Sequence, residues 1–358
     1  MPGGVLGPAR RGRPFLTEKG TDRGAEMARP GTRRRRLLVP ALLGCLAVAV
    51  ALAIAVVWRT DVYDRNIGRI TDAVPDEGGR PVDDPGENWL LIGSDMRGES
   101  TADKWREGEA DADVIMLLHV PEGEARAYVV AISRDSWVDI PGHGRGKLAD
   151  AYSEGGPKLL TQTVEELGGV RVDHFAAVDF AGFEAMTDAL GGVVIDLPYE
   201  VYDPTNGWYW EAGENRMDGE EALRFVRERK GLSGSDLDRI ERQQVFLRAM
   251  AEKAVSEEVR GDPRRLDAFL VAASESVAVD EDTTMAMMRG LMMRLVGIGP
   301  EGTVFMMLPA SSTGWEGEQN VVYLDGEIVS GVFERVRDGG LMEYITEHGL
   351  EHEARSID

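Results

Sequence analysis

Arginine side chains gather in one segment of a strongly acidic chain. The protein has 40 Lys and Arg residues against 63 Asp and Glu residues, yet the stretch 224–248 is rich in basic groups. Guanidinium groups bind phosphate oxygens through paired hydrogen bonds, and several together suit a pyrophosphate better than a single carboxylate does. The segment therefore predicts an anion site. Its basic residues are Arg224, Arg227, Arg229, Lys230, Arg239, Arg242 and Arg248.

Two helices on either side of a short loop are expected to position these groups. Asp218 and Glu221 form a cap-plus-three pair that is typical of a helix start, and Arg227 and Arg229 leave the end of that helix. A Gly-Ser loop follows at 231–235. Guanidinium groups can therefore converge from both sides of one loop.

The second helix opens at residue 235 or 236 and contributes the other half of the predicted site. Arg239, Arg242 and Gln243 occupy positions i, i+3 and i+4, so their side chains share one face. The alternative interpretation is a solvated helix face that pairs with acidic neighbours, and composition alone leaves both open. The acidic neighbours are Glu228, Asp236, Asp238 and Glu241.

Four further polar clusters lie at the ends of expected strands. Asp95 and Arg97 directly follow one strand, at the sheet edge where α/β proteins usually bind ligands. Asp111 and Asp113 precede the next strand with their carboxylates on one side. Carboxylates without His or Cys favour a hard ion such as Mg²⁺, usually shared with a substrate phosphate, although ordinary turns also use such residues. The other clusters are Ser133-Arg134-Asp135 and Lys147 with Tyr152.

Short apolar runs alternate with helical patterns along the body of the chain. The runs are rich in β-branched residues and bounded by turn residues, as buried strands are. This alternation predicts an α/β sandwich with helices on both faces of a sheet. Strands are expected at 89–93, 114–120, 127–133, 175–178, 193–197, 304–308 and 320–324, and helices at 156–167, 181–190, 236–256, 263–274, 283–298 and 328–337.

An uncharged segment, 37–58, separates a basic head from the acidic body. At a rise of ~1.5 Å per residue, it is long enough for the ~30 Å hydrocarbon core of a bilayer. Arginines occupy all of 33–36, directly before the segment, which predicts a transmembrane helix with a cytoplasmic N-terminus. A cleaved signal peptide is the alternative, but the run exceeds the usual roughly 7 to 15 residues and no small-x-small cleavage motif follows.

The predicted organisation has five parts. The single cysteine, Cys45, lies in the apolar segment, so the body is expected to rely on its core without a disulfide. The acidic body lacks the basic stripe that nucleic-acid binding needs, so no nucleic-acid partner is expected. The parts are a disordered cytoplasmic head (1–36), a transmembrane helix (37–58), an extracellular stalk (59–88), one extracellular domain (89–345) and a tail (346–358).

Methionines crowd the C-terminal third of the chain. Methionine fills irregular apolar space, which suits either a loosely packed core or a groove for a flexible lipid. We favour the core. The residues are Met285, Met287, Met288, Met292, Met293, Met306 and Met307.

Eight motifs in order resemble the LytR-CpsA-Psr proteins of Gram-positive bacterial envelopes. The resemblance covers 88–250, and the single anchor with a basic cytoplasmic head also fits that family. The motifs are L-L-I-G-S-D-M-R (90–97), D-A-D-V-I-M-L-L (111–118), S-R-D-S-W-V (133–138), G-K-L-A-D-A-Y (146–152), V-D-F-A-G-F (178–183), A-L-G-G-V (189–193), L-R-F-V-R-E-R (223–229) and D-L-D-R-I-E-R-Q-Q (236–244).

The resemblance implies a three-layer α-β-α sandwich around a mixed sheet, preceded by one transmembrane helix. It also implies that the protein holds a polyprenyl-pyrophosphate-linked glycopolymer with its lipid tail in an apolar pocket. The expected reaction is Mg²⁺-dependent transfer of the sugar phosphate onto a hydroxyl of peptidoglycan.

Site residues also follow from the resemblance. Asp95 and Asp113 correspond to metal-associated aspartates, and Asp95 is our choice for the carboxylate that accepts the proton of the attacking hydroxyl. The pyrophosphate-binding set is Arg97, Arg134, Lys147, Arg227, Arg229, Arg239 and Gln243, of which Arg134, Arg227 and Arg229 are also expected to act in catalysis.

Two other functions share these residues. A polyprenyl-pyrophosphate phosphatase would use water in place of the sugar hydroxyl. A non-catalytic module that grips lipid-linked polymer is the third reading, because Asp111 stands where the family has a basic residue and Ala149 where it has an amide. Turnover, and product bound to the wall, would separate the three.

Overall fold

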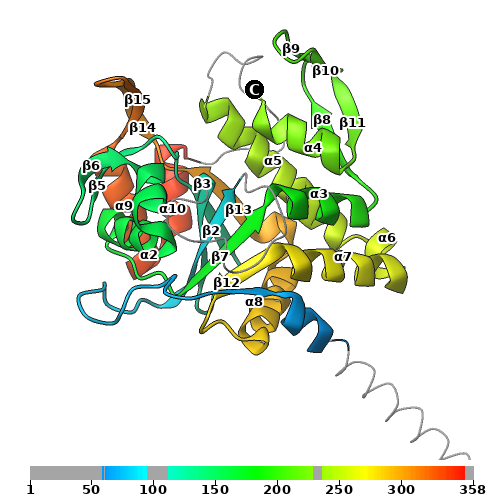
Figure 1. The fold of residues 1–358 in the computed structure, drawn as a ribbon, viewed down its shortest axis with the longest axis horizontal. Coiled ribbons are helices and arrows are strands. Elements are labelled where there is room, and N and C mark those ends of the chain that lie inside the picture. Colours follow the sequence, from blue (N-terminus) through cyan, green and yellow to red (C-terminus); the bar gives the residue numbers. More distant parts are fainter. Residues whose placement is uncertain (1–58, 60, 95–111, 229–235, 351–358) are drawn as a thin grey trace, which may run out of the picture. The chain divides into compact units, whose positions relative to one another are not determined.

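A seven-stranded mixed sheet forms the centre of the protein (Figure 1). The computed structural model describes residues 59, 61–94, 112–228 and 236–350, with the side chains of 236–238 excepted. Parallel pairing joins β1 to β12, β7 to β2 and β4 to β13, and the other neighbours are antiparallel. Across the sheet the strands are β1 (Gly68–Ile70), β12 (Val277–Asp280), β7 (His174–Asp179), β2 (Gly86–Ser94), β3 (Ala112–Pro121), β4 (Ala127–Ala131) and β13 (Thr303–Met307).

Alternating side chains divide the core into two layers, one on each face of the sheet. In β3, Ile115 and Leu117 join the first layer, whereas Met116 and Leu118 join the second. The first layer packs against α2 (Leu148–Gly168), α9 (Gly326–Asp338) and α10 (Leu341–His348). The second packs against α3 (Phe180–Ala189), α4 (Gly219–Arg227), α5 (Asp236–Ala254) and α8 (Met285–Ile298). The expected α/β fold around a mixed sheet is therefore confirmed.

Four two-stranded ribbons and further short or peripheral helices surround this centre. The helix α7 (Pro263–Ser276) packs against α3, and α6 (Glu257–Arg260) precedes it. The ribbons are β5 (Trp137–Ile140) with β6 (Gly144–Lys147), β8 (Val193–Leu197) with β11 (Gly213–Met217), β9 (Val201–Asp203) with β10 (Trp208–Trp210), and β14 (Ala310–Glu316) with β15 (Gln319–Leu324).

The segment expected to be a stalk instead belongs to the folded domain. The strand β1 lies at one edge of the central sheet, and Ile70 and Ala73 are buried in the first core layer. The hydroxyl of Thr161 in α2 donates a hydrogen bond of 2.9 Å to the carbonyl oxygen of Ala73. The stalk prediction for 59–88 is therefore wrong, because backbone pairing and burial tie this segment to the sheet.

Several predictions concern residues outside the described ranges. They include the cytoplasmic head, the apolar segment 37–58, the end of the tail from 351, and the site residues Asp95, Arg97 and Arg229. Within the described ranges, no helix combines the length and apolar character that a membrane crossing requires.

The methionines of the C-terminal third do not share one environment. Met306 is buried in the first core layer, and Met285 and Met288 of α8 pack against the second. Met292 and Met293 lie on the exposed side of α8. These methionines are thus partly core and partly surface, and the cavity described below is lined by others.

His119 of β3 is a buried histidine that should make folding sensitive to acid. Its Nδ1 lies 2.7 Å from Oδ1 of Asn88, and burial lowers its pKa from 6.5 to about 4. Between these two pKa values the imidazole is therefore neutral in the folded protein and protonated in the unfolded chain. The resulting stability is complete above about pH 6.5 and is lost as the pH falls towards 4.

We expect this loss to disappear in His119→Gln. Between pH 7 and pH 4.5 the free energy of unfolding of the wild type should fall by about 2 to 3 kcal/mol more than that of the variant. Urea titrations at the two pH values measure the difference. Parallel losses in both proteins would show that His119 does not control acid stability.

Candidate functional site

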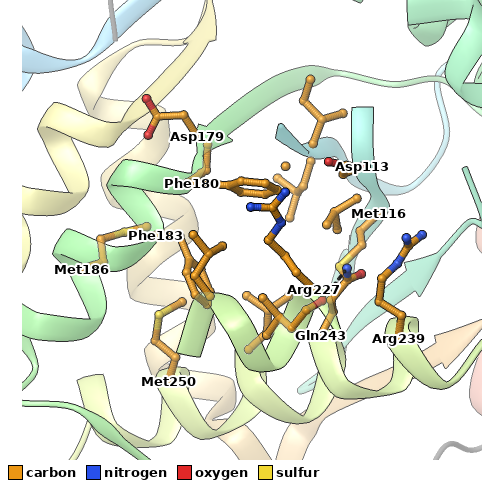
Figure 2. A pocket seen from close by; sticks show the side chains of 18 of the residues that line it. Asp113, Met116, Asp179, Phe180, Phe183, Met186, Arg227, Arg239, Gln243 and Met250 are labelled. Atoms are coloured by element: carbon orange, nitrogen blue, oxygen red, sulfur yellow. Dashed lines mark hydrogen bonds between the residues drawn. The ribbon is translucent and has the colours of Figure 1, made fainter. Parts of the chain in front are cut away.

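A cavity of about 800 Å³ lies between the second face of the sheet and helices α3, α4 and α5 (Figure 2). Its walls are mainly apolar and come from strands β2, β3 and β7 on one side and from the helices on the other. A mainly apolar space of this size suits a hydrophobic ligand. The apolar walls include Leu91, Met116, Ala176, Phe183, Met186, Leu247 and Met250.

Local sequence features place the helices around this space. Asp179 caps α3 by accepting a 2.6 Å hydrogen bond from the amide of Gly182, and Asp218 caps α4 through a 2.9 Å bond from the amide of Glu221. Gly182 also lets α3 approach α7, because a Cβ atom there would lie 2.1 Å from Cβ of Ser276. The helix start predicted at Asp218 is confirmed.

Charged and amide side chains gather in one part of the cavity lining. Arg134, which follows β4, forms an ion pair with Asp113 at the start of β3, and each side chain is about one fifth exposed. The carbonyl oxygen of Arg134 accepts a 3.0 Å hydrogen bond from the amide of Ala149, which fixes the backbone behind the pair. A carboxylate and a guanidinium group are thus held next to each other, within reach of solvent.

Helices α4 and α5 contribute the other polar groups. The guanidinium group of Arg227, at the end of α4, lies 4.8 Å from the ring centroid of Phe180, and Figure 2 shows the side chain extending towards that ring. Such a cation–π contact orients the guanidinium group. The N–H bonds at the edge of that planar group remain available to an anion. From α5, Arg239 lines the same cavity, and Gln243 donates a 3.4 Å hydrogen bond to the carbonyl oxygen of Val226.

The structure thus brings five of the predicted site residues to one cavity. Lys147 is different, because it caps α2 and its Nζ forms a 2.7 Å ion pair with Oδ1 of Asp135. It does not line the cavity, although its partner is the neighbour of Arg134 in the chain. The five residues are Asp113, Arg134, Arg227, Arg239 and Gln243.

Sequence reasoning did not place Phe180, Trp208 or Glu228 in the site, although all three line the cavity. Phe180 lies within one of the quoted motifs, but an aromatic residue after a strand usually belongs to a core. Glu228 was interpreted as a surface partner of the arginines, yet it is buried. Burial opposes ionisation of Asp203, but a hydrogen bond shared with Glu228 and one donated by the amide of Thr205 outweigh it and hold the pKa of Asp203 below its ordinary value.

Asp113 offers one carboxylate that a hard divalent ion could use together with a substrate phosphate, although Arg134 pairs with it here. Carboxylate oxygen is the ligand that Mg²⁺ prefers, and neither His nor Cys lines the described cavity. Among the described residues, no group of three or more His, Cys, Asp or Glu side chains could enclose an ion by itself. A metal held by one or two carboxylates and completed by substrate phosphate is compatible with this arrangement.

Comparison with known proteins identifies related sequences and folds. A sequence model described as the LytR_cpsA_psr family matches residues 70–334. The "Probable cell wall biosynthesis protein LcpB" of Corynebacterium glutamicum is 39% identical over 242 residues, which cover 64% of this chain and 57% of that protein. The "Polyisoprenyl-teichoic acid--peptidoglycan teichoic acid transferase TagU" of Oceanobacillus iheyensis is 34% identical over 175 residues, 47% of this chain and 52% of that protein.

A solved structure shares the fold. The "LytR-Csp2A-Psr enzyme from Actinomyces oris" superposes with a TM-score of 0.58 and 21% identity, covering 76% of this chain and 96% of that one. The aligned parts of this chain span just over half the length of the two curated relatives.

Proposed function

The chain belongs to the LytR-CpsA-Psr family, and on that premise we propose that it is a membrane-anchored phosphotransferase. Its donor is a glycopolymer on a polyprenyl-pyrophosphate carrier, and its acceptor is a hydroxyl group of peptidoglycan. In this proposal the segment 37–58 anchors the protein, the N-terminus is cytoplasmic, and the folded domain faces outward. The name of the Oceanobacillus iheyensis relative, a teichoic acid transferase, supports the substrate class.

One observation carries the proposal: an apolar cavity has cationic groups in its lining. A polyprenyl pyrophosphate has the same two-part character, a long hydrocarbon chain joined to a compact anion. The apolar walls would bury the chain, and each buried carbon atom contributes about 0.8 kcal/mol to binding. Arg227, Arg239 and Gln243 would hold the pyrophosphate oxygens by charge-assisted hydrogen bonds.

The reaction is a displacement at the phosphorus atom that carries the sugar. The acceptor oxygen forms the new P–O bond, the bond to the bridging oxygen breaks, and polyprenyl phosphate leaves with the electron pair. Asp95, which lies outside the described residues, is proposed to take the proton of the hydroxyl. Arg134 and Arg227 stabilise charge that develops on the phosphoryl oxygens. Asp113, together with Asp95, would hold Mg²⁺, which supplies further charge neutralisation when bound.

The test is a reconstituted transfer reaction. The full-length protein in detergent is incubated with a lipid-pyrophosphate sugar donor, peptidoglycan oligomers and Mg²⁺, and saccharide attached to peptidoglycan is measured by mass spectrometry. We expect attached product that disappears with EDTA. Release of polyprenyl phosphate without attachment would instead support the phosphatase, and donor binding without turnover would support the non-catalytic module.

Arg227→Lys should slow transfer or weaken donor binding by about tenfold. An ammonium group keeps the charge, but it lacks the planar two-point fit to phosphate and loses part of the contact with Phe180. A charge-assisted hydrogen bond contributes about 1.5 to 3 kcal/mol, which corresponds to tenfold or more. Titration of the lipid-pyrophosphate donor measures the effect.

The matched control is Arg224→Lys on the same helix. Arg224 is exposed and pairs with Glu220 one turn earlier, and exposed pairs contribute about 0 to 1 kcal/mol. The Arg224→Lys variant should bind the donor with an affinity within about twofold of the wild type. If Arg227→Lys behaves like this control, Arg227 is also a solvated helix residue and the pyrophosphate site must be placed elsewhere.

A further inference from the structure

Helix α8 is apolar over most of its circumference, yet it has no fully buried residue. Its inward side packs against the second core layer, but helices with apolar residues on all sides are normally buried all round. Of the ten large apolar side chains that are strongly exposed in the described part of the chain, four lie on this helix, so exposed apolar surface is concentrated here. They are Met287, Met292, Met293 and Val296.

Three neighbouring side chains lie on the side of α8 that is turned away from the packed residues. At about 100° per residue, Arg289, Met293 and Val296 fall within roughly 60° of one another around the helix axis. Met293 is 68% exposed and Val296 is 47% exposed. Met292 lies at the border with the packed side. We call Arg289, Met293 and Val296 the outer face of α8.

The local charge around α8 is opposite to that of the whole protein. The chain has 63 acidic against 40 basic residues, but residues 283–300 contain two arginines and no Asp or Glu. Arg294 pairs with Glu87 of β2, whereas Arg289 is exposed and has no ion-pair partner among the described residues. An apolar surface with a free cation complements an anionic lipid surface, because the arginine stem can lie along hydrocarbon while its head meets a phosphate.

The chain that follows the predicted anchor leads to this helix. Arg59, directly after 37–58, donates a 2.5 Å hydrogen bond to Asp267 of α7, and Arg69 of β1 donates one to the carbonyl oxygen of Thr283, just before α8. Six of the residues between the two arginines are helical, so the start of α8 lies within roughly 30 Å of Arg59. Both α8 and the blue segment after Arg59 are drawn at the lower edge of the domain (Figure 1). An anchor that ends at residue 58 would therefore hold α8 near the bilayer.

We propose that the outer face of α8 rests in the surface of the lipid bilayer, with Met293 and Val296 at the boundary of the hydrocarbon and Arg289 on anionic headgroups. This inference rests on the proposed function, because it needs the anchor 37–58. Helix α8 covers the same face of the sheet as the helices around the cavity. Docking would thus hold that face near the membrane, which supplies the lipid-linked donor.

A fluorescent label tests this contact without any reaction. Cys45 is the only cysteine, so Cys45→Ser/Met293→Cys takes a single nitrobenzoxadiazole label. In full-length protein reconstituted into vesicles of phosphatidylcholine and phosphatidylglycerol, the emission should shift to shorter wavelength and be quenched by lipids with a nitroxide near the headgroup. The matched control is Cys45→Ser/Trp315→Cys, because Trp315 is 69% exposed but lies on the β14–β15 ribbon. Its label should behave as in water.

Substitutions within the outer face test both parts of the contact in the protein labelled at position 293. Arg289→Gln should lower the ratio of docked to undocked protein about fivefold in anionic vesicles, because one basic side chain near such a surface contributes about that factor. In vesicles of phosphatidylcholine alone it should have little effect. Val296→Glu should abolish the spectral shift, whereas Val194→Glu on β8, where the valine is 48% exposed, should preserve it.

The outcomes separate docking from the proposed reaction. Equal spectra for the labels at positions 293 and 315 in anionic vesicles would overturn the proposal. A shift that depends on the protein-to-lipid ratio would also overturn it, since a second copy would then cover the outer face. Transfer activity with a label that stays in water would refute only the docking, and docking without transfer would refute only the proposed reaction. Protein that fails to float with the vesicles would contradict the anchor itself.

Discussion

Replacing Asp113 with asparagine should reduce metal-dependent transfer by about 1,000-fold. The substitution keeps the shape of the side chain but removes the negative charge that pairs with Arg134 and that would help to hold Mg²⁺. Loss of a single group that stabilises transition-state charge costs about 100- to 1,000-fold in rate, and a weakened metal site adds to that loss. Transfer rates at saturating donor measure the effect, and Mn²⁺ titration followed by electron paramagnetic resonance reports metal affinity.

The same substitution should hardly change the stability of the folded domain. The side chains of Asp113 and Arg134 are each about one fifth exposed, and a partly exposed ion pair contributes about 0 to 1 kcal/mol. The thermal midpoint without metal should therefore shift by only a few degrees. Asp139→Asn is the matched control, because Asp139 is a highly exposed carboxylate whose closest ion-pair distance, to Arg145, is 3.7 Å. It should retain full activity and metal affinity.

Three outcomes distinguish the roles of Asp113. Loss of turnover together with weaker Mn²⁺ binding supports a metal ligand. Loss of turnover with unchanged Mn²⁺ binding would mean that Asp113 acts by positioning Arg134, and Arg134→Lys should then reproduce the defect. Turnover equal to that of Asp139→Asn would remove Asp113 from the site.

Local pattern predicted the strands that have a complete run of apolar residues. Residues 114–120 predict β3 because β-branched and apolar side chains fill both faces of a central strand, and 175–178 predict β7 in the same way. Strand β12 was missed between two helices, and β1 was assigned to a stalk. With four and three residues, these strands are too short for periodicity to identify, and long-range pairing with neighbouring strands stabilises them.

The partner of a given strand is also decided by tertiary contacts. Residues 193–197 form a strand as expected, but it pairs with β11 outside the central sheet. The alternating burial of this strand, with Val194 and Asp196 exposed, is what a ribbon with one solvated face requires. Alternation shows that a strand is half buried, and it does not identify the partner strand.

The polar part of the candidate site could be predicted from residue type and position, whereas the cavity could not. Asp113 stands at the start of β3, Arg134 follows β4, and Arg227 stands at a helix end, where side chains can meet a ligand. An empty space depends on what several side chains far apart in the sequence leave unfilled, such as Ala176 of the sheet and Met250 of the helix layer. Lys147 was placed in the site because its motif matches the family. The motif did not reveal that its ammonium group pairs with Asp135.

Filling the cavity should abolish the use of long-chain donors without destabilising the protein. Ala176 of β7 and Met250 of α5 both line the cavity, from the sheet and from the helix layer. Ala176→Phe and Met250→Trp would each place aromatic volume in the space proposed for the polyprenyl chain. Larger side chains in an already empty space can raise stability, so the thermal midpoint should stay constant or rise. A damaged core would lower the thermal midpoint. This measurement therefore distinguishes a blocked cavity from a misfolded protein.

The size of the effect follows from the hydrocarbon that is displaced. One isoprene unit has five carbon atoms, and at about 0.8 kcal/mol per buried carbon its loss corresponds to roughly 4 kcal/mol. Even half of that unit would weaken donor binding about 30-fold, so we expect a decrease of about 100-fold for long-chain donors in either variant. A donor with two isoprene units has less hydrocarbon to lose and should be weakened less than a long-chain donor. The phosphate-binding groups are unchanged in both variants.

Met292→Trp is the matched control for Met250→Trp. Met292 lies on the exposed side of α8 and does not line the cavity, so its replacement adds the same aromatic volume elsewhere. Donor affinity is measured by titration with a series of lipid pyrophosphates of increasing chain length. If affinity in the two cavity variants falls equally for short and long donors, the substitutions disturb the phosphate site. If it falls for none of them while the thermal midpoints are unchanged, the lipid chain binds outside this cavity, and the two-part ligand inferred from an apolar wall with cationic groups must be abandoned.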